Sequence, residues 1–180
     1  MVYMQSPVHI IDGIYLGGVP VLRQRDFLQH RCITHILKLF YNHEVLSYPD
    51  PQKMLIPALP SWLDELTAVA QAFTVFDTPL KLDAPILPEA FEQGINFLRN
   101  QVRGGNHALI FSRERTVRAP ILAVAYLMEV HRYEMPDAVR LVSKLNRTVG
   151  FGMNPAPWQS LMTYFKTPYT PDDLKYWWSD

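Results

Sequence analysis

The stretch that most constrains the fold of this chain runs from residue 108 to residue 126. It opens with Ala-Leu-Ile-Phe after a Gly-Gly-Asn turn, a run too short for a helix, which predicts a buried strand. The polar residues 112–118 follow, and Ala119-Pro120 then opens an alanine-rich apolar run in which proline suits the first helical turn. Strand, polar loop and helix in this order direct backbone N–H groups and a helix N-terminus toward one point, which favours anion binding.

The composition allows one globular domain and argues against several classes of function. A chain of 180 residues with 48% hydrophobic residues can bury a sizeable core. Its 17 basic and 17 acidic residues balance, so we expect neither nucleic acid nor a membrane as a partner. The single cysteine, Cys32, excludes an internal disulfide framework and is expected to be a small buried residue. No His/Asp/Glu spacing indicates a metal site, and we expect no metal and no cofactor.

The sequence predicts no targeting or membrane-spanning segment. Residues 1–20 lack a charged start followed by a long apolar run. The longest apolar stretch, residues 119–130, is too short to cross a bilayer. We therefore expect a soluble, cytoplasmic protein.

The other segments alternate strand and helix signals. Asp12-Gly13 between two short apolar pieces predicts a hairpin over residues 8–16, and residues 32–40 are rich in β-formers and predict a core strand. A further strand, broken at Pro79, is expected over residues 73–82. Apolar residues at helical spacing predict helices over 21–30, 61–73, 89–102, 119–130, 135–146 and 157–165, with a terminal turn or helix capped by Thr170. This order predicts an α/β fold around a central sheet.

Residues 41–60 are expected to be irregular, because four prolines interrupt them. The helix that follows begins with a capping pattern, Ser61-x-x-Asp64. Long connections of this kind are often functional. Trp62 and the Trp177-Trp178 pair are either interaction anchors or a cover for the domain's own apolar surface, and the second interpretation is favoured.

Four segments in the same order resemble the dual-specificity branch of the protein tyrosine phosphatase superfamily. They are residues 11–17 (Ile-Asp-Gly-Ile-Tyr-Leu-Gly), 33–39 (Ile-Thr-His-Ile-Leu-Lys-Leu), 88–97, and Asn154-Pro155 followed by Trp158 and Leu161. The resemblance implies an α/β, protein tyrosine phosphatase-like central mixed sheet flanked by helices. It further implies a phosphatase-like domain over residues 1–166, an extra helical insertion at about 41–73, and a C-terminal extension over 167–180. We expect the residues after Tyr164 to pack against the insertion.

The active-site signature of that family is only partly present. The family has His-Cys, five residues, Arg, then Ser or Thr, with a Gly three places after the Cys. Aligned on Arg118, this chain has Phe111 for the His, Ser112 for the Cys, Arg115 for the Gly and Ala119 for the Ser or Thr. The family's general-acid Asp falls on Asp83.

The resemblance therefore implies a role for each of these positions. Ser112 takes the nucleophile position, Asp83 the general-acid position, and Arg118 the position that binds phosphate and stabilises the transition state. The implied phosphate-binding loop consists of Ser112, Arg113, Glu114, Arg115, Thr116, Val117 and Arg118.

A serine at the nucleophile position changes the chemistry. The family's thiolate forms near neutral pH because amides, a helix N-terminus and the Arg depress the pKa of the Cys. A serine hydroxyl is a useful nucleophile only beside a base, and Glu114 is the only candidate in the loop, with no evident orientation toward Ser112. Arg115 also replaces a Gly, which tolerates backbone angles that bulkier residues avoid.

Three hypotheses remain open from the sequence. The first is a pseudophosphatase, inactive as an enzyme, that binds phosphate, sulfate or phosphorylated protein through the loop. The second is an active protein tyrosine/serine/threonine phosphatase captured as a Cys-to-Ser variant, which leaves Phe111, Arg115 and Ala119 unexplained. The third is a non-enzymatic interaction scaffold with no ligand in the loop, in which Arg118 would form internal salt bridges. Asp83 is in any case a residue type common in turns and caps.

Overall fold

The computed structural model describes residues 6–114, 116–147 and 154–177. Its centre is a five-stranded sheet in the order β1-β2-β5-β3-β4. Strands β1 (Val8–Ile11) and β2 (Ile14–Gly17) pair antiparallel, as the hairpin signal predicts. The remaining neighbours pair parallel, through β3 (Ile33–Lys38), β4 (Thr74–Asp77) and β5 (His107–Phe111). The expected mixed α/β sheet flanked by helices is confirmed.

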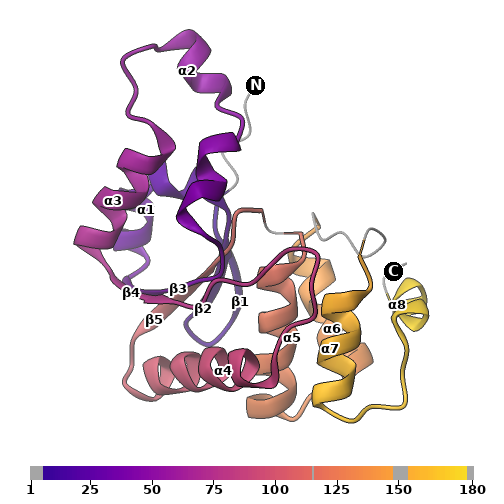
Figure 1. The fold of residues 1–180 in the computed structure, drawn as a ribbon. Helices are drawn as coiled ribbons and strands as arrows, with labels where there is room; N and C mark the ends of the chain where they lie inside the picture. Colours follow the sequence, from indigo (N-terminus) through magenta and orange to yellow (C-terminus); the bar gives the residue numbers. More distant parts are fainter. Residues whose placement is uncertain (1–5, 115, 148–153, 178–180) are drawn as a thin grey trace.

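Helices cover both faces of this sheet (Figure 1). One face packs against α4 (Pro88–Arg103), α5 (Arg118–His131), α6 (Met135–Leu145) and α7 (Ala156–Tyr164). The other packs against the 3-10 helix η1 (Val19–Arg23), α1 (Arg25–His30), the 3-10 helix η2 (Asn42–Ser47) and α3 (Trp62–Ala72). The chain closes with η3 (Pro171–Asp173) and α8 (Leu174–Trp177).

Strand β5 lies in the middle of the sheet and contributes to both apolar cores. Ala108 and Ile110 pack on the side of α5, whereas Leu109 and Phe111 pack on the side of α3. Successive side chains of a strand point to opposite faces, so a strand covered on both faces is apolar throughout. This burial explains the continuous apolar run that dominates the sequence.

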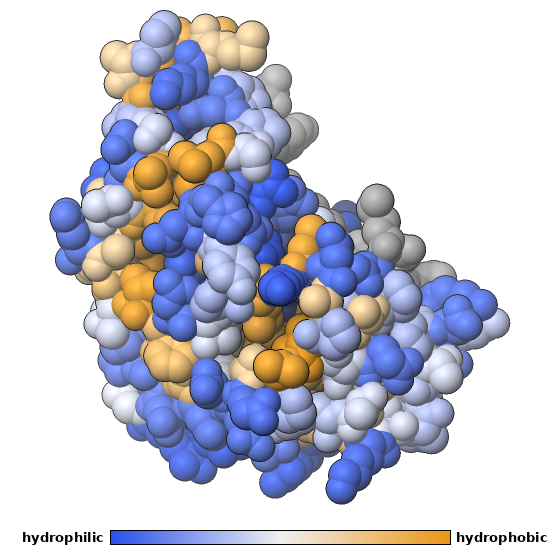
Figure 2. Space-filling model, in the orientation of Figure 1, coloured by the Kyte–Doolittle hydropathy of each residue, from blue (hydrophilic) through white to orange (hydrophobic). Residues whose placement is uncertain are grey.

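The insertion at residues 41–73 supplies η2, α2 (Pro51–Leu55) and α3. Helix α2 projects away from the body (Figure 1), and apolar atoms gather at the end of this projection (Figure 2). Helix α8 instead packs near α6 on the other side of the molecule, so the expectation that the C-terminal segment packs against the insertion is wrong.

Local sequence signals account for most element boundaries. Ser61 and Asp64 form a reciprocal capping box at the start of α3, and Thr170 and Asp173 do the same before α8. Gly105 follows α4 with a φ of 74°, a left-handed conformation that glycine adopts readily. Trp62 and Trp177 are buried, as the favoured interpretation predicts, and Trp178 lies outside the described residues.

Some expectations are wrong. Cys32 is exposed, because it adopts a φ of 55° in the turn that leads into β3 and does not share the burial of the strand. Residues 21–30 form parts of η1 and α1 with a break at Gln24 rather than one helix, and the strand expected over 73–82 ends at Asp77. Within the described ranges, none of the helices is both long and apolar enough to span a membrane.

Candidate functional site

The loop of interest joins the carboxyl end of β5 to the first turn of α5. The backbone N–H of Ser112 donates to Gly17 O at 3.1 Å, and Arg113 O accepts from the backbone N–H of Val19 at 3.2 Å. These bonds attach the loop to the end of β2. The loop therefore lies at the carboxyl ends of parallel strands and before a helix N-terminus, where α/β folds bind ligands.

Ser112 is fully buried, and its hydroxyl already donates a hydrogen bond within the loop. Its Oγ donates to the backbone oxygen of Glu114, two residues along the loop. The carboxylate of Glu114 lies 3.2 Å from the guanidinium of Arg113 instead. A neutral carbonyl oxygen cannot take up the hydroxyl proton as a general base, so this hydrogen bond orients Ser112 without activating it.

Arg118 begins α5, one residue before the predicted start at Ala119, and its side chain is buried in an internal ion pair. Nη1 and Nη2 donate to the two carboxylate oxygens of Glu44 in η2, at 3.0 and 2.7 Å, and Nη1 also donates to Leu80 O at 2.9 Å. Glu44 Oε1 accepts a further bond from the backbone N–H of Tyr41 at 2.9 Å. Arg118 thus holds a carboxylate in the two-pronged geometry suited to an oxyanion.

The electrostatics of this pair favour a charged Glu44. Burial alone would raise the pKa of Glu44, but hydrogen bonds from Arg118 and from the N–H of Tyr41 outweigh it and hold the pKa below its ordinary value. At neutral pH the positive charge of Arg118 is therefore balanced by Glu44, and that of Arg113 partly by Glu114. The local basic character suggested by the loop sequence is reduced, and Arg115 lies outside the described residues.

The remaining positions in and beside the implied loop are partly or fully buried. Phe111 is buried and packs edge-on against Phe40, with ring centroids 4.8 Å apart. Ala119 is completely buried under the sheet, whereas Thr116 and Val117 are half-buried. Phe111 and Ala119, which stand where the family has catalytic supports, are core residues here.

Asp83 is exposed and belongs to a different hydrogen-bond group from the loop. Its carboxylate accepts from Asn154 Nδ2 at 3.1 Å, and Asn154 Oδ1 accepts from the backbone N–H of Ala156 at the start of α7. In the described part of the chain, no hydrogen bond joins Asp83 to the loop. The structure places Ser112 and Arg118 at the two ends of one loop and Asp83 beside a helix cap.

Glu44 is the residue that the sequence did not identify. It lies 74 positions from Arg118, in a segment expected to be irregular, and no motif links the two. Its local signal is the capping bond with Tyr41, which resembles that of any helix start. In the described ranges, no group of three His, Cys, Asp or Glu side chains is arranged to hold a metal ion.

Comparison with curated proteins finds one clear sequence relative, and no protein-family model matches the chain. The chain is 25% identical over 141 residues to dual specificity protein phosphatase 22-A of Danio rerio. The match covers 78% of this chain and 57% of that protein, so the chain spans little more than half of the relative's length.

Solved structures with the same arrangement of elements are more distant in sequence. Human DUSP28 has a TM-score of 0.68 at 19% identity, covering 90% of this chain and 94% of that one. Human tyrosine phosphatase-like serine/threonine/tyrosine-interacting protein has a TM-score of 0.69 at 20% identity, covering 89% and 95%. A mouse putative dual specificity phosphatase complexed with zinc tungstate has a TM-score of 0.67 at 16% identity, covering 89% and 86%.

Proposed function

We propose that this chain, which has the fold of the dual-specificity phosphatases, is a catalytically inactive domain of that type that acts by binding other proteins. The fold and the resemblance to the dual-specificity branch rest on the sequence relative and on the solved structures together. The observation that carries the proposal is that both key positions of the loop are occupied by the protein itself. Ser112 bonds to Glu114 O, and Arg118 bonds to Glu44.

The absence of turnover follows from the chemistry of Ser112. Its hydroxyl is far harder to deprotonate than a thiol, and its hydrogen bond goes to a carbonyl oxygen rather than to a base. Asp83, at the general-acid position, is held by Asn154. In this proposal neither residue acts as an acid, a base or an activated nucleophile.

The interaction role follows from the state of Arg118. A guanidinium that already binds a carboxylate with both prongs must exchange one anion for another before it binds phosphate. In this reading the pair joins the loop to η2 and stabilises the fold, and surfaces outside the loop contact the partner. This is the scaffold hypothesis raised by the sequence.

A second candidate function is the binding of phosphate or phosphorylated protein by the same loop. It is favoured by the position of the loop at the N-terminus of α5 and by the tungstate complex of the mouse neighbour, since tungstate is an oxyanion like phosphate. In this candidate the incoming anion displaces Glu44 from Arg118. A phosphate dianion carries more charge than a carboxylate, which favours that exchange.

Titration calorimetry with phosphate and with a phosphotyrosine peptide separates the two candidates. The scaffold proposal expects no binding to wild type or to Arg118→Ala, and binding to Glu44→Gln, in which the guanidinium loses its charged partner. Binding to wild type that Arg118→Ala abolishes would instead establish the phosphate-binding candidate. Circular dichroism of each variant checks that the fold is retained.

The second hypothesis from the sequence, an active enzyme captured with a serine, is tested by Ser112→Cys with an aryl phosphate as substrate. We expect no turnover, because Phe111 and Ala119 remain core residues and Glu44 still occupies Arg118. Vigorous turnover by Ser112→Cys would mean that the loop is competent and that only the nucleophile is missing.

A further inference from the structure

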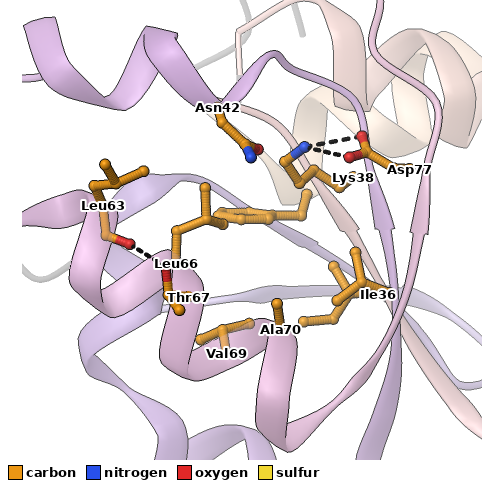
Figure 3. A pocket seen from close by; sticks show the side chains of 11 residues that line it. Ile36, Lys38, Asn42, Leu63, Leu66, Thr67, Val69, Ala70 and Asp77 are labelled. Carbon is orange, nitrogen blue, oxygen red and sulfur yellow. Dashed lines mark hydrogen bonds and ion pairs between the residues drawn. The ribbon is translucent and has the colours of Figure 1, made fainter.

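A cavity of about 190 Å³ lies between α3 and the face of the sheet opposite α5 (Figure 3). Its floor consists of two rows of residues that are in register across the strands, Ile36 with Val75, and Lys38 with Asp77 and Phe111. Its roof is one face of α3, made of residues at helical spacing: Leu63, Leu66, Thr67 and Ala70. The cavity is therefore mostly apolar; its polar side chains are Lys38 and Asp77, where the strands end, with Asn42 and Thr67.

The mouth of this cavity holds an ion pair. Lys38 Nζ lies 2.8 Å from both carboxylate oxygens of Asp77, an arrangement that gives a buried ammonium the partner it needs. The Lys38 side chain is 5% exposed and that of Asp77 53%, so the cation is hidden and the carboxylate faces outward.

The same chain carries an exposed apolar tip where its insertion projects farthest from the body (Figure 1). Met54, Leu55 and Ile56, in α2 and directly after it, are 87%, 78% and 55% exposed. Lys53 precedes them and is the only charged residue between Pro51 and Pro60. Contiguous exposed apolar side chains of this size mark interaction sites on soluble proteins.

The tip is held away from the body rather than hanging from a loose loop (Figure 1). Arg23 anchors both ends of the projecting segment. Its guanidinium donates to the two carboxylate oxygens of Asp50 at 2.9 and 2.7 Å and to Pro60 O at 3.0 Å, and it stacks on the ring of Trp62 at 3.8 Å. A preorganised apolar projection loses little conformational freedom on binding.

We propose that two copies of this chain associate reciprocally, the tip of each entering the cavity of the other. The apolar side chains of the tip match the apolar lining. Asp77 is half exposed, and its carboxylate has lone pairs beyond those that Lys38 takes, so it can accept a second hydrogen bond from Lys53. An apolar cavity of about 150 Å³ holds a benzene molecule, so this one has room for one Leu or Met side chain. Because tip and cavity belong to the same chain, a two-fold axis forms two identical contacts.

The test measures mass in solution by light scattering after gel filtration, over a range of concentrations. Wild type is expected to reach twice the 20.8 kDa of one chain as its concentration rises. Leu55→Asp places a charge on the apolar tip. Ala70→Arg places a long side chain at an exposed position on the cavity roof, where it blocks the cavity. Each variant alone is expected to stay monomeric. An equimolar mixture is expected to recover a weaker dimer, since one intact tip still meets one intact cavity.

Matched controls separate this association from misfolding or general stickiness. Leu87→Asp changes a similarly exposed leucine outside the tip, and Ala72→Arg makes the same substitution on α3 outside the cavity; both are expected to dimerise like wild type. The circular dichroism spectrum of every variant should match wild type. Wild type that stays monomeric at all concentrations overturns the proposal. So does a dimer that survives either Leu55→Asp or Ala70→Arg, or a mixture that does not recover association.

Discussion

At the scale of single residues, the ion pair between Arg118 and Glu44 determines whether the loop has a free guanidinium to bind an anion. An arginine at the start of α5 would be a strong anion receptor if its fork were free, because the helix N-terminus adds to its charge. Here the guanidinium already binds the carboxylate of Glu44 in η2. The same carboxylate also caps η2 by accepting from the backbone N–H of Tyr41. The side chain of Glu44 therefore holds the start of η2 and balances the charge of Arg118.

We expect Glu44→Gln to destabilise the fold, by about 2 kcal/mol in urea unfolding at neutral pH, since it weakens hydrogen bonds to a buried charge. Arg140→Gln is the control: it breaks the exposed pair with Asp137 and should change the free energy of unfolding by less than about 0.5 kcal/mol. A loss in Glu44→Gln no larger than in the control would show that the pair contributes nothing to stability.

The difference between wild type and Glu44→Gln should also depend on pH. The folded-state pKa of Glu44 lies below its ordinary value of 4.5, so the carboxylate form is the one that the fold stabilises. Its contribution is fully present above pH 4.5 and is lost as the pH falls through the folded-state pKa. Urea midpoints measured for both proteins from neutral to acidic pH should converge at the acid end. A constant gap would contradict this assignment.

How well the sequence predicts the site depends on how far apart in the sequence the interacting residues lie. The placement of Ser112 after a strand and of Arg118 at a helix start is encoded within a dozen residues, and both are correct. The contact with Glu44 depends on how η2 packs, and the pairing of Lys38 with Asp77 depends on strand register. The prediction that Cys32 is buried was wrong for a local reason. Cys32 itself adopts a left-handed conformation, which places it in the turn before the strand.

At the scale of elements, Arg23 holds the projecting segment around α2, residues 50–60, to the body. This side chain is almost fully buried and contacts Asp50, Gln52, Pro60 and Trp62. Its hydrogen bonds to Asp50 also hold the pKa of that carboxyl below its usual range. The attachment explains how an element as short as α2 keeps a defined position away from the core.

We expect Arg23→Ala to release the segment around α2 and to cost about 3 kcal/mol, as does removal of one partner from a buried ion pair. Limited proteolysis should then cut within residues 50–60 faster than in wild type. Arg25→Ala is the matched control, because Arg25 is exposed and reaches Glu65 only at 3.7 Å. Equal cleavage of both variants would mean that Arg23 does not hold the segment.

Element boundaries were predicted where the chain carries its own start or stop signal. Ser61, Gly105 and Thr170 do so, and the helices and turns next to them lie where expected. The 3-10 helices η1 and η2 were not predicted, because single turns have no repeating apolar face. Their positions are set by packing against α3.

At the scale of the whole molecule, the C-terminal segment belongs to the main core. Leu174 and Trp177 of α8 join the apolar cluster that includes α5 and α6. The ring of Trp177 also packs edge-on against Tyr169, with centroids 4.8 Å apart. The expected boundary at residue 166 therefore divides segments that share one core.

We expect Trp177→Ala to lower the free energy of unfolding by about 3 kcal/mol, the cost of deleting a large buried aromatic side chain. Tyr176→Ala, which removes an exposed aromatic next to it, should have little effect. Thermal unfolding of a chain ending at Lys166 should show a loss at least as large as that of Trp177→Ala. A truncated chain as stable as the full one would make residues 167–180 a separate extension.

The central place of β5 has a consequence for the order in which the chain can fold. Strands β1 and β2 pair with each other, as do β3 and β4, but only β5 joins the two pairs. During synthesis from the N-terminus, the first hundred residues lack the strand that joins the two pairs, so they cannot form a continuous sheet. The sheet becomes one cooperative unit only when residues 107–111 leave the ribosome and are inserted between strands made long before.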